Sequence, residues 1–117
     1  MEVVYGEPRK YVSKEFFRAV LKSIALSNPK HVMKAFTKAY LVIDGKYIRI
    51  PKKNVKVETY NDSLKICVNI PDALRNETNG AKIEVLLINK VKPVCGFMVK
   101  SDWEVNNVCL KFTLTLT

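Results

Sequence analysis

The stretch YLVIDGKYIRI, from Tyr40 to Ile50, decides the fold that this sequence predicts. Apolar and β-branched residues fill both halves of the stretch, and Asp44-Gly45 stands between them. Asp-Gly in this position favours a two-residue type I′ turn, because both central residues of that turn need a positive φ. The stretch therefore predicts an antiparallel β-hairpin, and Pro51 ends its second strand.

The chain beyond the hairpin continues with the two-residue period of strands. Strands are predicted around 55–57, 64–70, 83–87, 94–100 and 108–117. A turn is predicted at Asn61-Asp62-Ser63, and a polar loop at 71–80. The last strand has the clearest pattern, since Val108, Leu110, Phe112, Leu114 and Leu116 alternate with less apolar residues.

The residues before the hairpin show the period of helices instead. Residues 1–12 are predicted to be extended and irregular, and Ser13 is a predicted N-cap. The helix that follows is expected to stop near Ser27, because Asn28-Pro29 is a strong boundary. Its apolar stripe is predicted to consist of Phe17, Val20, Leu21 and Ile24.

A second helix is predicted to start at Asn28 as the cap, with Pro29 in the first position. Its apolar stripe is predicted to consist of Val32, Met33, Phe36, Ala39 and Tyr40. Two helices followed by about six or seven strands predict an α+β protein whose strands form an antiparallel β-sandwich or jelly-roll-like pair of sheets. The length fits a single domain over residues 1–117, with a helical basic part at 1–40 and a β-rich part at 41–117.

Positive charge is concentrated in the first half of the chain. The net charge is +9, and residues 1–58 carry 13 Lys/Arg against 5 Asp/Glu, whereas residues 59–117 carry 7 against 6. Such asymmetry indicates an acidic partner for one side of the molecule. The predicted contacts to an acidic protein or to phosphates are Lys14, Arg18, Lys22, Lys30, Lys34, Lys38, Arg49, Lys52, Lys53 and Lys56.

No pattern of catalytic, metal-binding or cofactor-binding residues stands out. The four glycines are too scattered for a phosphate loop, and the single histidine, His31, is interpreted as an ordinary helix-surface residue. Asp102 and Glu104 flank Trp103 and form one weak carboxylate pair, interpreted as part of a solvated turn. We therefore expect a protein that is not an enzyme and has neither metal nor cofactor.

The three cysteines, Cys67, Cys95 and Cys109, have no metal-site spacing. They are interpreted as small thiols that are buried or half-buried, with one Cys67–Cys109 cross-link as the alternative. The absence of a long apolar run and of a signal-peptide pattern predicts no membrane span and a virion or cytoplasmic location. The sequence has many lysines and no glutamine, as thermophile proteins tend to have.

Two segments of the second half resemble small β-rich structural proteins of tailed viruses, such as tail-fibre and baseplate-associated domains. The resemblance covers residues 79–117 and rests on the turn and strand Asn79-Gly80-Ala81-Lys82-Ile83-Glu84-Val85 and on the closing strand KFTLTLT at 111–117. It implies a non-enzymatic assembly protein.

Two functions follow as hypotheses. The first is a structural or assembly protein, a virion component for example, that acts through contacts with protein subunits in a homo- or hetero-oligomer and presents a basic helical face. The second is a nucleic-acid-binding protein without sequence specificity, whose lysines contact phosphates.

Overall fold

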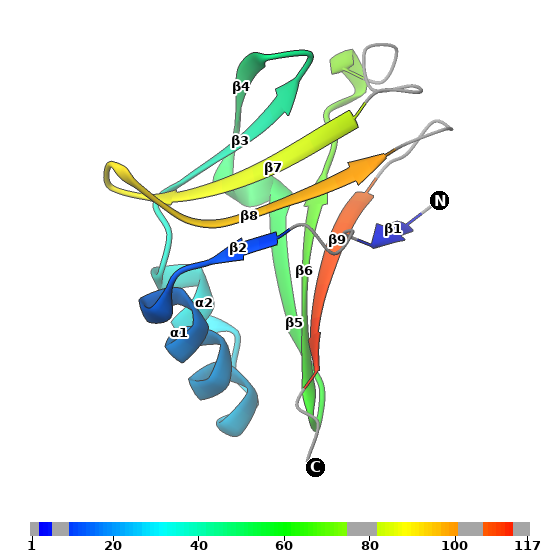
Figure 1. Ribbon diagram of the computed structural model, residues 1–117. Coiled ribbons are helices and arrows are strands. Elements are labelled where there is room, and N and C mark those ends of the chain that lie inside the picture. The colour runs from blue at the N-terminus through cyan, green and yellow to red at the C-terminus, as the bar shows by residue number, and fades with distance from the viewer. Residues whose placement is uncertain (1–2, 6–9, 75–81, 101–106, 114–117) are drawn as a thin grey trace.

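The computed structural model describes residues 3–5, 10–74, 82–100 and 107–113 (Figure 1). The elements in these residues are, in chain order, β1 (Val3–Tyr5), β2 (Lys10–Val12), α1 (Lys14–Ala25), α2 (Lys30–Lys34), β3 (Lys38–Ile43), β4 (Lys46–Ile50), η1 (Lys52–Asn54), β5 (Val55–Thr59), β6 (Ser63–Asn69), η2 (Asp72–Leu74), β7 (Lys82–Asn89), β8 (Lys92–Lys100) and β9 (Asn107–Thr113). The prediction of an α+β protein rich in strands is confirmed.

The strands form two sheets. Sheet A has the order β1-β9-β6-β5, and sheet B has the order β2-β8-β7-β3-β4. All neighbouring strands are antiparallel except β1 and β9, which run parallel. The prediction of about six or seven strands was too low, because the N-terminal residues predicted to be irregular contribute one edge strand to each sheet.

The sheets do not close into the predicted sandwich. In Figure 1, β7 and β8 run across the strands β5, β6 and β9, and the two helices fill the side on which the sheets diverge. Helix α1 packs against both β6 and β8. The core lies between the two sheets and the helices, and its largest fully buried side chains include Phe16, Phe36, Leu41, Ile66 and Phe97.

Helix α1 begins where the sequence predicts, since the Ser13 side chain accepts a hydrogen bond from the Phe16 amide at 3.1 Å. Its buried side is shifted by one residue, because Phe16 is fully buried whereas Phe17 is 45% exposed. Val20 and Ile24 are buried as predicted.

The second helix is much shorter than predicted. Its N-cap is Pro29 and not Asn28 as predicted, although the Asn28 side chain accepts a hydrogen bond from the Lys30 amide at 3.0 Å, and α2 ends at Lys34. Residues 38–43 instead form β3, which pairs with both β4 and β7. The backbone hydrogen bonds of two neighbouring strands therefore outweigh the helical period of Phe36, Ala39 and Tyr40.

The hairpin at 40–50 is confirmed. Asp44 and Gly45 have φ values of 50° and 79°, as the two central residues of a type I′ turn require. Its strands pair over the full length of β4, from Ala39 opposite Ile50 to Ile43 opposite Lys46.

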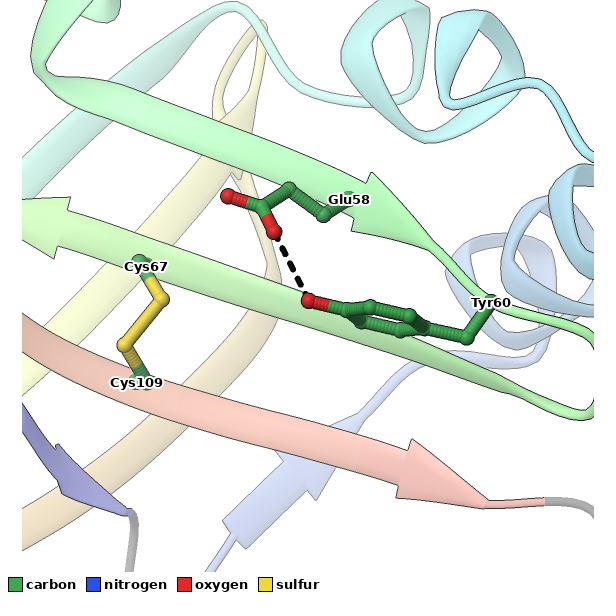
Figure 2. The surroundings of a disulfide bond; sticks show 4 residues. All are labelled: Glu58, Tyr60, Cys67 and Cys109. Carbon is green, nitrogen blue, oxygen red and sulfur yellow. Dashed lines mark hydrogen bonds between the residues drawn. A yellow bond between two sulfur atoms is a disulfide. The ribbon is translucent and has the colours of Figure 1, made fainter.

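Two of the three cysteines form a disulfide, so the interpretation of all three as thiols was wrong and the alternative was right. Cys67 on β6 and Cys109 on β9 are directly opposite each other, with their Cα atoms 4.1 Å apart (Figure 2). Sequence spacing cannot reveal this pairing, because it depends on the register of strands far apart in the chain. Cys95, on β8, is buried and takes no part in the disulfide.

Candidate interaction surfaces

Three predicted contact residues form one basic line along α1. Lys14, Arg18 and Lys22 are four residues apart, and all three are exposed. Phe16 and Val20, which bind α1 to the core, are buried. We call Lys14, Arg18 and Lys22 the α1 stripe.

The predicted basic face of the second helix is reduced to two residues. Lys30 and Lys34 are exposed on α2. Lys38 does not continue this helix, because it is the first residue of β3, is half-buried and lies opposite Ile88 of β7. The prediction that Lys38 lies on the second helix was therefore wrong.

Lys52 has a partner within the protein. Its Nζ donates a hydrogen bond to the backbone carbonyl of Phe36 at 2.8 Å and lies 4.6 Å from the centre of the Phe36 ring. These contacts attach η1 to the segment that follows α2. Lys52 therefore has a structural role, whereas the neighbouring Lys53 is exposed.

Arg49 and Lys56 lie on different layers of the molecule. Arg49 is opposite Tyr40 in sheet B, and Lys56 is opposite Cys67 in sheet A. Both are exposed and alternate with buried residues, so each points away from the core on the outer face of its own sheet. The ten predicted contact residues thus do not form one continuous face.

The outer face of sheet B is largely apolar. Strand pairing places Arg49, Tyr40, Leu86, Gly96 and Tyr11 in one row across five strands. The next row consists of Tyr47, Val42, Glu84 and Met98. We call these nine residues the apolar outer face; they include one positive and one negative side chain, Arg49 and Glu84, and the flanking rows of the same sheet face add Lys38 of β3 and Lys82 of β7.

The exposed aromatic rings of this face are its most prominent features. Tyr47 is 67% exposed and Tyr11 is 55% exposed. The rings of Tyr40 and Tyr47 contact each other edge to face, with their centres 6.5 Å apart. Tyrosine exposed in this way is typical of protein interfaces, where the ring is buried and the hydroxyl stays hydrogen-bonded.

A hollow of about 530 Å³ opens beside the Tyr11 ring, and its other lining residues include Glu84, Leu86, Pro93 and Met98. Gly96 also lines it and contributes no side chain. A Cβ at this position would lie 3.1 Å from Cδ2 of Leu86, so any larger residue would push into the hollow or displace Leu86. The hollow can accept an apolar side chain beside the Glu84 carboxylate.

The outer face of sheet A has the opposite character. Lys65 of β6 is directly opposite Lys111 of β9 on one side and Glu58 of β5 on the other. The next row contains Lys56, Cys67 and Cys109. We call Lys56, Glu58, Tyr60, Lys65 and Lys111 the basic outer face, with three positive charges and one negative.

Tyr60 completes this face. Its hydroxyl donates a hydrogen bond to Oε2 of Glu58 at 2.8 Å, and Figure 2 shows its ring lying along β6 on the side that carries the disulfide. The hydrogen bond to Glu58 raises the pKa of Tyr60, while nearby Lys65 opposes the rise. The ring is 45% exposed and is therefore a flat aromatic surface among lysines.

The part of the chain that the structure describes contains no group of three or more His, Cys, Asp or Glu side chains able to hold a metal ion. His31 is half-buried on α2. Asp102, Trp103 and Glu104 lie outside the described residues, so their interpretation as a solvated turn stays a prediction.

The sequence did not reveal which residues lie side by side on the outer face of each sheet. Lys65 and Lys111 occupy alternating positions of predicted strands, which indicates that they point outward. Their direct opposition depends on the register of β6 and β9, two strands separated by β7 and β8 in the chain. The row from Arg49 to Tyr11 depends in the same way on the order of sheet B.

Comparisons with protein-family models, with curated proteins and with solved structures found no match. Among the residues that the structure describes, no helix is long and apolar enough to cross a membrane.

Proposed function

We propose that this chain is a non-enzymatic structural or assembly protein that acts through subunit contacts, and that a second copy of the chain packs on the apolar outer face. The observation that carries the proposal is the apolar patch at the centre of the outer face of sheet B, in which two tyrosines are more than half exposed. Large apolar patches on soluble proteins mark interaction sites.

The charges of this face favour a second copy over an unrelated partner. Arg49 and Glu84 lie on the same face, in adjacent rows and two strands apart. In a two-fold symmetric dimer each patch meets itself, so Arg49 of one copy can approach Glu84 of the other. The hollow beside Gly96 would receive an aromatic or aliphatic side chain of the partner copy, in the way that buried anchors fill pockets at interfaces.

The α1 stripe would then be a second contact surface, directed at an acidic subunit. It points away from the core on a helix, whereas the apolar outer face belongs to sheet B, so the two surfaces can be occupied independently. The disulfide favours a virion or another oxidising environment over the reducing cytosol, with intracellular proteins of hyperthermophiles as the known exception. The resemblance of residues 79–117 to tail-fibre and baseplate-associated domains supports the same choice.

The test is the mass of the purified protein in solution across micromolar concentrations, measured by sedimentation equilibrium. Leu86→Arg places a charge at the centre of the apolar outer face, and we expect it to weaken self-association by at least about tenfold. Val91→Arg is the matched control, because Val91 is 89% exposed at the turn between β7 and β8, away from this face. A wild-type protein that stays monomeric, or equal effects of the two variants, would contradict the proposal.

A second candidate function is nucleic-acid binding without sequence specificity. The observation that favours it is the number of exposed lysines and arginines outside the apolar outer face, Lys14, Arg18, Lys22, Lys30, Lys34, Lys53 and Lys56 among them. Its test is salt-dependent binding to a random DNA duplex, which should weaken steeply between about 50 and 300 mM salt.

A further inference from the structure

We propose that the basic outer face of sheet A is a binding surface for single-stranded nucleic acid. This inference goes beyond the proposed assembly role and does not depend on it. It uses Lys65, Lys111 and Tyr60, which are not among the ten contact residues that the sequence predicts.

The register places two like charges face to face. Lys65 and Lys111 are directly opposite each other on β6 and β9, where residues have Cβ atoms about 5 Å apart. Like charges in this arrangement destabilise a sheet. An anion bound between the two ammonium groups would remove that repulsion, so the pair favours a negatively charged ligand.

The one acidic group of the face offsets only part of this charge. Glu58 is opposite Lys65, but one of its carboxylate oxygens already accepts the hydrogen bond from Tyr60. Lys56, two residues before Glu58 on β5, adds a third ammonium group; Lys56 and Lys111 are exposed and Lys65 is half-buried. The face therefore keeps a positive excess over three adjacent strands.

Tyr60 favours a nucleic acid over other polyanions, because its ring offers a surface on which a base can stack. Its backbone amide donates to the Ser63 carbonyl at 2.8 Å, and its hydroxyl is held by Glu58, so the ring is fixed at both ends. An exposed aromatic ring beside lysines is the arrangement on which single-stranded bases stack while their phosphates meet the positive charges. A duplex keeps its bases paired inside the helix, and an acidic peptide has no base to stack.

The disulfide joins β6 and β9, the two strands that carry Lys65 and Lys111. Cys67 follows Lys65 by two residues on β6, and Cys109 precedes Lys111 by two residues on β9, so the cross-link lies in the next row of the same face. It keeps β6 and β9 in the register that brings the two lysines together. A ligand can therefore bind without ordering these strands first.

The experiment measures binding of the full-length, oxidised protein to a fluorescent oligothymidine by anisotropy, at salt concentrations from about 50 to 300 mM. A random duplex and polyglutamate serve as competitors. We expect the Lys65→Glu/Lys111→Glu variant to lose at least about tenfold in affinity and to flatten the salt slope by about 1.4, at about 0.7 per phosphate contact of a single strand. Tyr60→Ala should weaken binding by about fivefold or more, because it removes one stacked base.

Matched variants make each outcome decisive. Lys14→Glu/Lys22→Glu changes the net charge equally on the α1 stripe and should have a much smaller effect. Lys65→Gln/Lys111→Gln removes both charges without adding new ones, so it separates lost contacts from misfolding. Comparable losses in the α1 and sheet A variants would overturn the inference, as would the absence of binding at the lowest salt.

Polyglutamate that displaces the oligonucleotide, together with an unaffected Tyr60→Ala variant, would also overturn it and would indicate an acidic protein partner. The assembly proposal fails by a different measurement. A protein that stays monomeric yet binds the oligonucleotide through Lys65 and Lys111 would contradict only the assembly role.

Discussion

The outer faces of the two sheets are built by the same rule and carry different chemistry. On both, every second residue of a strand points away from the core. In sheet A these positions include Lys56, Glu58, Lys65 and Lys111, whereas the central rows of sheet B hold mainly tyrosines and aliphatic residues, with Lys38 and Lys82 in the flanking rows. The inward positions are similarly apolar on the two sheets. The core therefore requires apolar residues only at the inward positions, and the residue types at the outward positions can differ between the sheets.

This difference separates two kinds of partner. A polyanion is attracted to the adjacent lysines of sheet A, whereas the central rows of sheet B offer it one positive and one negative side chain and only the flanking rows add Lys38 and Lys82. An apolar protein surface can bury the tyrosines of sheet B, but on sheet A it would have to desolvate charges, which is unfavourable. The two proposed partners would therefore occupy different layers of the protein.

The largest expected effect comes from removing the disulfide beneath the basic outer face. Cys67→Ala/Cys109→Ala opens a loop between residues 42 apart in sequence, so we expect the free energy of unfolding to fall by about 4 kcal/mol. Urea denaturation measures this change. Cys95→Ala removes a buried thiol without opening a cross-link and should cost less; equal losses in the two variants would contradict the assigned role of the disulfide.

Reciprocal tyrosine variants test whether the two faces are independent. Tyr47→Ala should weaken self-association by about 1–2 kcal/mol and leave oligonucleotide binding unchanged. Tyr60→Ala should do the reverse. Sedimentation measures self-association and anisotropy measures oligonucleotide binding on the same two samples. A folded variant that loses both self-association and oligonucleotide binding would contradict the independence of the two faces.

Lys52 belongs to neither face and should affect only stability. Lys52→Met removes the hydrogen bond to the Phe36 carbonyl and the contact with the Phe36 ring, so we expect a loss of about 1 kcal/mol. Lys53→Met, one residue along the same turn, should stay within about 0.5 kcal/mol of the wild type. Thermal unfolding measures both, and reduced oligonucleotide binding by Lys52→Met would mean that Lys52 does contact phosphates.

The smallest effect concerns the titration of Tyr60. Its pKa lies above the ordinary value of 10.0, mainly because the hydroxyl donates to Glu58. The folded state favours the protonated form, so this contribution to stability is present below pH 10.0 and is lost as the pH rises through the folded pKa. Glu58→Gln should move the pKa of Tyr60 back towards 10.0, as tyrosinate absorbance would report; an unchanged value would contradict the assigned cause.

Local signals predicted the local parts of the fold well. The Asp44-Gly45 turn and the Ser13 cap each depend on residues within a few positions, and both are confirmed. The prediction of the second helix was wrong where long-range strand pairing decides the structure, because residues 38–43 pair with two neighbouring strands in sheet B. Helical period in a short segment cannot compete with a complete set of strand hydrogen bonds.

The candidate surfaces were less predictable than the fold, for the same reason. Residue type and period indicated that Lys65 and Lys111 point outward, but only the sheet order reveals that they are opposite each other. The sequence also grouped Lys52 with the contact residues, although its charge is used to hold Phe36. Net charge indicates that acidic partners are favoured, and it does not say which lysines are free to bind them.

The most direct test of the two-face account is sedimentation velocity of the protein mixed with a fluorescent oligothymidine, observed through the fluorophore and through the protein. The account predicts that the oligonucleotide sediments with a dimer for the wild type and with a monomer for Leu86→Arg. It predicts a dimer without oligonucleotide for Lys65→Glu/Lys111→Glu. A single variant that abolishes both dimerisation and oligonucleotide binding while remaining folded would contradict the account.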